Sequence, residues 1–149
     1  MAQPSVTPLA RLRPVLCRLL TIAWILVIFS FSLQAGDEST TQSGFIVQIV
    51  VSIFKLLSIP TEGYNLAFWV RKTAHFTEYF ILGFWIFQSY KEKPHKVFLY
   101  GVYWIPILDE WIQAFVPGRV SSPIDMGIDA LGLSVGLYLM FSLSRRFRF

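Results

Sequence analysis

The chain alternates between long apolar stretches and short polar segments. Four stretches are long enough to form helices that cross a bilayer, at residues 14–33, 66–90, 97–116 and 125–143. A transmembrane helix needs about 20 residues to cross the hydrocarbon core. Open strands would leave unpaired backbone groups in lipid, so helices are the expected elements. The pattern predicts an all-α, polytopic membrane helical bundle with four transmembrane helices.

A fifth apolar segment lies between the first two predicted membrane helices. It reads "GFIVQIVVSIFKLLSIP" and follows the acidic loop "QAGDESTTQSG". Its polar residues Gln48, Ser52 and Lys55 share one narrow helical stripe, and Pro60 ends the pattern. About 15 apolar residues are too few to cross a bilayer comfortably. We expect a short interfacial or re-entrant helix, with a fifth hydrophobic helix packed on the bundle as an equal alternative.

The N-terminal segment resembles both a signal peptide and a first membrane helix. Arg11, Arg13 and Arg18 accompany an apolar run over residues 15–33. That run is longer than the roughly 7–15 residues of a signal-peptide core, and Leu33 would occupy a position that cleavage reserves for a small residue. We therefore expect an uncleaved first transmembrane helix.

Composition favours a membrane protein and argues against a nucleic-acid binder. Of the 149 residues, 54% are hydrophobic and 15% are charged, and the mean hydropathy is +0.55. Soluble domains average about 25% charged residues. The net charge is +4, but the basic residues lie at the ends of apolar runs rather than along one polar face. We expect a single domain over residues 1–149 and no nucleic-acid partner.

The distribution of basic residues predicts the orientation in the membrane. They gather before the first predicted helix, between the second and third, and after the fourth, whereas the other two loops carry few. The positive-inside rule then places both termini in the cytoplasm. Arg71 and Lys72 count against this orientation unless they serve a site. The three basic groups are Arg11 and Arg13; Lys91, Lys93 and Lys96; and Arg145, Arg146 and Arg148.

The helix predicted over residues 66–90 carries an unusual set of polar side chains. Arg71, His75 and Glu78 recur at spacings of four and three, which places them on one stripe with Tyr79 beside it. Lys72 lies about 100° away from that stripe, so we rank it last among the candidates. Charged side chains are costly in lipid and generally mark a functional site.

The next two predicted helices also carry polar faces. In residues 97–116, Asp109 and Gln113 share a face, Glu110 flanks them and need not be buried with them, and Pro106 is expected to kink the helix. In residues 125–143, the aspartates and two glycines share a face, and the glycines permit a close approach of helix backbones. The residues on that face are Asp125, Asp129, Gly132 and Gly136.

The predicted topology brings these three polar faces together in the outer half of the membrane, beneath Arg119. The cluster then holds three positive and five negative side chains, a deficit of two positive charges. Protonated carboxyls, a charged His75 or a bound cation could compensate, because unpaired buried carboxylates are too costly. The members are Arg71, Lys72 and Arg119, and Glu78, Asp109, Glu110, Asp125 and Asp129.

The segments "RKTAHFTEYFILG" and "DEWIQAFVPGRVSSPIDMGIDALGLSVG" resemble the VanZ-like family of small bacterial membrane proteins. The resemblance extends over residues 15–143, and "FSFSLQ" is similar to the serine-containing end of the family's first helix. Asp129 departs from the family, in which many members carry Asn. The residues that match the pattern are Lys72, His75, Tyr79, Leu82, Gly83, Asp109, Glu110, Gln113, Phe115, Gly118, Arg119, Ser122, Asp125, Gly132 and Gly136.

The resemblance implies a multi-pass cell-envelope protein of the bacterial cytoplasmic membrane with four to five helices. The founding member is associated with low-level resistance to teicoplanin, a lipoglycopeptide that acts outside the cell. The family name supplies no reaction, so we expect a non-enzymatic protein. Its outward-facing site would bind membrane lipid, a lipid-linked cell-wall precursor or the lipoglycopeptide. The candidate ligand-binding residues are Arg71, Lys72, His75, Glu78, Tyr79, Asp109, Glu110, Gln113, Arg119, Asp125 and Asp129.

Two alternatives stay open. One is an intramembrane hydrolase or transferase acting on a lipid-linked substrate, with its catalytic residues drawn from His75, Glu78, Asp109 and Asp125. The other is a charge network that only holds the helices in register. We expect no cofactor, although a divalent cation such as Mg²⁺ or Mn²⁺ would suit the carboxylates.

Overall fold

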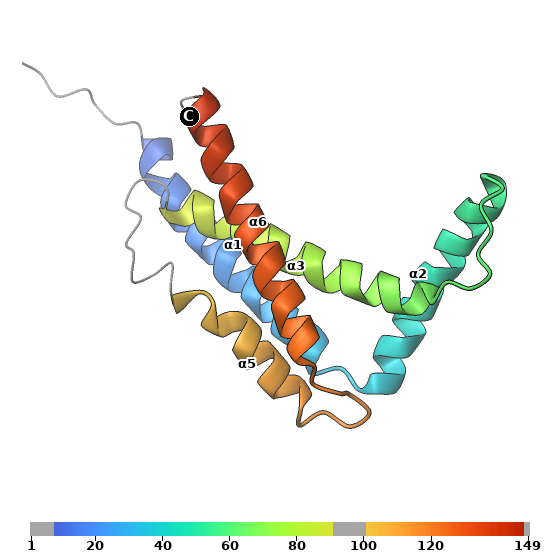
Figure 1. Ribbon diagram of the computed structural model, residues 1–149. Helices are drawn as coiled ribbons and strands as arrows, with labels where there is room; N and C mark the ends of the chain where they lie inside the picture. The colour runs from blue at the N-terminus through green and yellow to red at the C-terminus, as the bar shows by residue number, and fades with distance from the viewer. Residues whose placement is uncertain (1–7, 91–100, 148–149) are drawn as a thin grey trace, which may run out of the picture.

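The computed structural model describes residues 8–90 and 101–147, which form helices joined by turns and loops (Figure 1). The part of the chain that it describes contains no strand, so the all-α prediction is confirmed. The helices are α1 (Pro8–Ser32), α2 (Gly36–Leu56), α3 (Leu66–Tyr90), α5 (Trp104–Gln113) and α6 (Pro123–Phe147).

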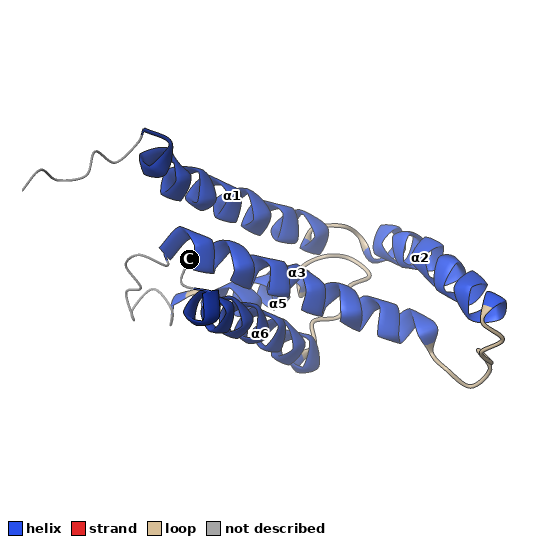
Figure 2. Cartoon of the chain, turned by 90° about the horizontal axis from the view of Figure 1, so that it is seen from above, coloured by secondary structure: helices blue, strands red, loops and turns tan. Residues whose placement is uncertain are grey.

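The packing of α3 against α6 forms the centre of the fold, with α1 on α3 and α5 between α1 and α6 (Figures 1 and 2). Gly132 and Gly136 of α6 lie against the backbone carbonyls of Phe76 and Phe80, and Gly83 of α3 lies against the backbone of α6. A Cβ atom at any of these glycines would collide with backbone. The predicted close approach through glycine is therefore confirmed.

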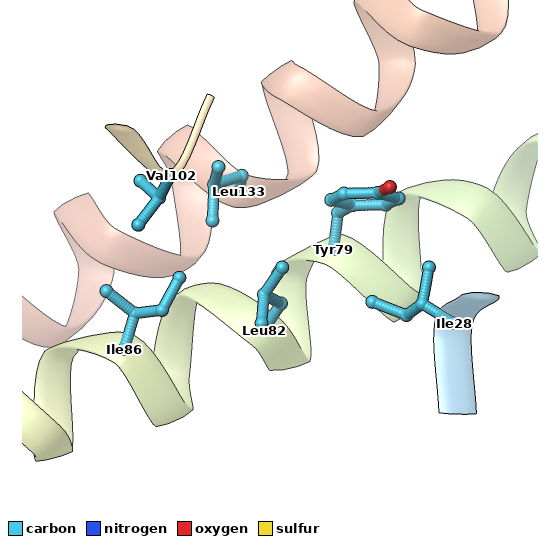
Figure 3. Close-up of a cluster of buried hydrophobic side chains, with 6 residues drawn as sticks. All are labelled: Ile28, Tyr79, Leu82, Ile86, Val102 and Leu133. Carbon is cyan, nitrogen blue, oxygen red and sulfur yellow. The ribbon is translucent and has the colours of Figure 1, made fainter. Parts of the chain in front are cut away.

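A small apolar core fills the space where α1, α3 and α6 meet (Figure 3). Hydrogen bonds also join α1 to α3. The Thr21 and Ser89 hydroxyl groups lie 2.8 Å apart, and Trp24 Nε1 donates a hydrogen bond to the Glu78 carbonyl at 2.9 Å. The core residues are Ile28, Tyr79, Leu82, Ile86, Val102 and Leu133.

Among the described residues, two helices are long and apolar enough to cross a membrane, at Leu12–Ser32 and Pro123–Arg146. Large apolar side chains on the outside of α1, such as Leu16, Leu19 and Leu26, are more than half exposed. Such a surface suits lipid better than water. These two helices give the chain membrane character and agree with the first and fourth predicted spans. The crossings by the other two predicted helices stay a prediction.

The continuous helix expected over residues 97–116 is wrong where the structure describes it. Residues 97–100 lie outside the described residues, and a turn at Val102 and Tyr103 precedes α5. The ten residues of α5 extend about 15 Å, half the thickness of the hydrocarbon core. Pro106 lies in the first turn of α5, where its missing N–H costs nothing. Pro106 thus follows the turn that interrupts the helix, and it does not kink a long helix.

The segment between α1 and the second apolar run is helical, not the loop that the sequence predicted. The helix α2 begins at Gly36, includes the acidic segment from that residue onward and ends at Leu56, before Pro60. Asp37 and Glu38 in its first turn face the positive end of the helix dipole and stabilise it. Because of this extension, α2 has 21 residues.

The start of α2 is fixed to the loop between α5 and α6. The Gly36 N–H donates a hydrogen bond to the Pro117 carbonyl at 3.1 Å. The Gly36 and Gly118 backbones are in direct contact, and Gly118 has a positive φ of 75°. A side chain at either position would push the two connections apart. The α1–α2 and α5–α6 connections therefore lie side by side, at the end of the bundle away from the described ends of the chain (Figure 1).

Candidate functional site

The polar residues of α3 face the first turns of α6 along one side of the pair. His75 Nδ1 lies 3.1 Å from Asp129 Oδ1, and both side chains are buried. Nearer the start of both helices, Lys72 Nζ forms an ion pair with the Asp125 carboxylate. Two successive turns of α3 thus each place a basic group against an aspartate of α6.

Lys72 takes part in an ion pair that the sequence does not predict. Helical spacing ranks Lys72 last among the candidates, because it lies about 100° from the stripe of Arg71, His75 and Glu78. The glycine contacts set the helices close enough for Lys72 to reach Asp125 across the interface. Arg71 is instead exposed, and Glu78 is partly buried.

The side chain of Asp109, from α5, is held from two sides. Ser32 Oγ, at the end of α1, donates a hydrogen bond to Asp109 Oδ1, and Gln113 Nε2 donates one to Oδ2 at 3.2 Å. The predicted shared face of Asp109 and Gln113 is confirmed, and both residues are buried. Ser32 is not among the predicted site residues, although the serine-containing end of the first helix is part of the family resemblance.

Glu110 is buried beside Asp109, a point that the sequence left open. Its Oε2 accepts a hydrogen bond from the Ser122 N–H at 2.6 Å. This bond connects α5 to the residue before α6, so Glu110 closes the loop between the two helices. Burial of both neighbours is feasible because Asp109 faces α1 and Glu110 faces this loop.

Arg119 binds the carboxyl-terminal end of α1. Its Nη2 donates to the Phe31 carbonyl at 2.6 Å and its Nε to the Gln34 carbonyl at 3.2 Å. Carbonyls at the end of a helix lack partners within the helix, so the guanidinium acts as a cap. Burial lowers the pKa of the Arg119 guanidinium, and the positive charge of Arg71 lowers it further.

This cap makes the stability of α1 depend on Arg119. We expect Arg119→Ala to lower the free energy of unfolding by about 2 kcal/mol, the usual range for hydrogen bonds from a charged donor. Arg119→Lys should recover only part of the loss, because an ammonium does not reproduce the planar fork that reaches both carbonyls. Thermal unfolding of the purified variants in detergent measures the effect. Equal melting temperatures for all three proteins would contradict the capping role.

The cluster opens into a cavity of about 190 Å³ between α1, α2 and α3, with a second space of about 80 Å³ next to it. Both spaces are lined by two arginines, His75, Gln113 and one serine of α2. The larger one also reaches Glu78, and the smaller one reaches Asp125. We refer to the two spaces together as the polar cavity. The lining residues common to both are Ser39, Arg71, His75, Gln113 and Arg119.

The polar cavity divides the predicted site residues into two sets. Six of the eleven line it, whereas the others lie behind its wall. Among the latter, Tyr79 is fully buried in the apolar core (Figure 3). Ser39 and Ser43 of α2 are not among the predicted residues, because the sequence of their segment predicts a loop. The residues behind the wall are Lys72, Tyr79, Asp109, Glu110 and Asp129.

The arrangement offers two kinds of chemistry. The contact with Asp129 orients the His75 ring, and a carboxylate-oriented histidine can act as a base. His75, Asp109 and Asp129 also each present a ligand atom within 4.8 Å of the others, a set that could hold a metal ion.

Comparisons with known proteins give one match. The model of a family described as VanZ/LLP1 matches residues 18–145, which include every helix of the cluster. Searches of curated protein sequences and of solved structures give no significant match.

Proposed function

Because the chain belongs to the VanZ/LLP1 family, we propose that it is a multi-pass cell-envelope protein that binds an anionic group in its polar cavity. The bound group is the head of a membrane lipid or of a lipid-linked cell-wall precursor. By holding it, the protein lowers the susceptibility of the cell to lipoglycopeptides such as teicoplanin. It lies in the bacterial cytoplasmic membrane with both termini in the cytoplasm.

The observation that supports this proposal is the pair of arginines in the cavity wall. Arg71 has no ion pair or hydrogen bond among the described residues, and it repels Arg119 across the same space. Arg119 uses only two of its five N–H donors on α1. An anion between the guanidinium groups would remove the repulsion and engage the remaining donors. Guanidinium groups bind phosphate and carboxylate well for this reason.

The position of α2 supports a lipid as the source of the anion. Ile46 lines the cavity beside the serines of α2, and the outward side of the helix carries exposed Phe45, Ile49 and Ile53. A polar wall next to an apolar outer surface suits a molecule with an anionic head and an acyl chain.

The arrangement of the ends supports the orientation. The start of α1 and the end of α6 lie toward the same end of the molecule (Figures 1 and 2), opposite the polar cavity. Arg145 and Arg146 stand in the last turn of α6. If that end faces the cytoplasm, as the positive-inside rule requires, the cavity opens on the outer side.

The test is to express the chain in a susceptible bacterial strain and to measure its sensitivity to teicoplanin and vancomycin. We expect lower sensitivity to teicoplanin than in the strain without the gene. Arg71→Ala, at equal protein level, should remove the effect, because one charged hydrogen-bond donor contributes about 1.5–3 kcal/mol, or tenfold or more in affinity.

Arg145→Ala is the matched control, since it removes a cation at the opposite end of the bundle. It should keep the wild-type effect. Unchanged sensitivity on expression of the wild-type chain would count against the resistance role. An effect that Arg71→Ala leaves intact would count against the cavity as its cause.

A hydrolase or transferase is the second candidate, favoured by the His75–Asp129 contact beside the cavity. His75 would take a proton from the attacking group, with Asp129 holding the ring in place. Incubation of purified protein with phospholipid and polyprenyl-phosphate substrates, followed by mass spectrometry, tests this. Products formed by the wild type but not by His75→Ala would establish the enzyme, and an unaltered substrate pool would exclude these reactions.

A further inference from the structure

We propose that His75, Asp109 and Asp129 bind one divalent transition-metal cation, Mn²⁺ or Zn²⁺, behind the wall of the polar cavity. The inference goes beyond the proposed function, which rests on the arginines of the cavity and needs no metal.

The first support is geometry. One ligand atom from each residue lies within 4.8 Å of the other two, and the three come from α3, α5 and α6. Ligands of a single ion at about 2.1 Å are separated by about 3–4 Å, depending on the angle between them. The 3.1 Å between His75 Nδ1 and Asp129 Oδ1 is within that range. The three groups are thus nearly at the spacing that one ion requires.

The second support is an oxygen without a partner. Asp129 is 0% exposed, and its Oδ2 has no hydrogen-bond partner among the described residues. Buried polar atoms are nearly always paired, since an unpaired one costs about 1–3 kcal/mol and a charged one more. A cation next to this carboxylate would supply the missing partner.

The third support is charge. Asp125 is balanced by Lys72, so the remaining acidic groups face only the two arginines. With neutral His75 and no anion in the polar cavity, two negative charges are left uncompensated, and three of the four acidic groups are buried. Burial of uncompensated carboxylates is costly. One divalent cation would bring the cluster to neutrality. The four acidic groups are Glu78, Asp109, Glu110 and Asp129.

Asp109 is already oriented as a metal ligand would be. Ser32 and Gln113 each donate a hydrogen bond to one of its oxygens. A carboxylate has about four lone pairs, so both oxygens keep one for a cation. Hydrogen bonds to a ligating carboxylate are the usual means of fixing its orientation.

The donor set decides the class of ion. An imidazole nitrogen suits transition metals such as Zn²⁺, whereas carboxylate oxygens also suit Mn²⁺. Ca²⁺ and Mg²⁺ prefer sites made entirely of oxygen, and Mg²⁺ usually keeps several waters. One nitrogen with two carboxylates therefore points to Mn²⁺ or Zn²⁺.

The experiment uses the full chain purified in detergent, stripped with a chelator and dialysed against Mn²⁺ or Zn²⁺. We expect inductively coupled plasma mass spectrometry to find one metal ion per chain in one of the two arms. The melting temperature of the protein should rise in the presence of that ion. Asp129→Asn keeps the shape of the side chain but removes its charge. It should lower the affinity at least about tenfold. Glu38→Gln, on the exposed start of α2, should bind like the wild type.

His75→Gln provides a second variant if Asp129→Asn does not give a monodisperse protein. A wild type that retains neither ion, with an unchanged melting temperature in both arms, would overturn the inference. Binding that survives in the folded variant would also overturn it. Failure here is distinguishable from failure of the proposed function, because the Arg71→Ala comparison measures drug sensitivity and not metal content.

Discussion

Gly132→Ala is expected to be one of the most damaging single-methyl changes in the described part of the chain. The added Cβ would meet the backbone carbonyl of Phe76, which cannot turn away as a side chain could. The helices α3 and α6 would have to separate, opening the contacts of His75 and Lys72 as well. Overpacking usually costs 1–3 kcal/mol, and we expect about 3 kcal/mol or more here because both partners are backbone.

The fraction of protein that stays monodisperse in detergent after heating measures this loss. Gly127→Ala is the matched control, since it adds the same methyl group to α6 where nothing lies within 4 Å. That variant should be as stable as the wild type or slightly more stable, because alanine favours a helix over glycine. Equal stability of the two variants would show that the close approach of α3 and α6 is not required.

The second large effect concerns the ion pair between Lys72 and Asp125. Their side chains are 13% and 9% exposed, so each charge depends on the other for compensation. Lys72→Met should cost about 3 kcal/mol, because it leaves a buried carboxylate without its partner. Adding Asp125→Asn should recover most of this loss, since removing both charges of a buried pair is often nearly neutral.

A double-mutant cycle on melting temperatures in detergent measures the coupling between the two residues. The expected result is a double variant that is more stable than Lys72→Met alone. Additive losses would mean that the two side chains contribute independently and that the pair does not form.

The apolar pattern was sufficient to predict the long helices. The predicted range 66–90 coincides with α3, and the predicted start of the last helix at residue 125 is two residues after the start of α6. These segments have long apolar runs with clear polar ends. The pattern failed at α2, because the first residues of this helix are polar and resemble a loop. The hydrogen bond from the Gly36 N–H to the Pro117 carbonyl, which fixes the start of the helix, cannot be seen in the sequence. The pattern also failed at α5, because the turn at Val102 and Tyr103 consists of apolar residues and does not interrupt the hydrophobic pattern.

The sequence predicts which side chains of the candidate site share a helix face, but not which residues of two helices form a pair. Spacing alone put His75 and Glu78 on one side of a helix and Asp129 on one side of another. Which residue meets which depends on the register of the two helices, and backbone contacts at the glycines set that register. For this reason the ion pair between Lys72 and Asp125 could not be predicted. Ser32 was missed because a serine at the end of an apolar run carries no chemical signal of its own.

The contact between Gly36 and Pro117 also has a mechanical consequence. It fixes the start of α2 to the loop that carries Arg119 through a backbone hydrogen bond and a close glycine contact. Arg119 in turn donates hydrogen bonds to the carbonyls of Phe31 and Gln34 at the end of α1. Any tilt of α2 toward or away from α3 would therefore be transmitted to the guanidinium in the cavity wall. We therefore expect the width of the cavity and the position of the Arg119 guanidinium to change together.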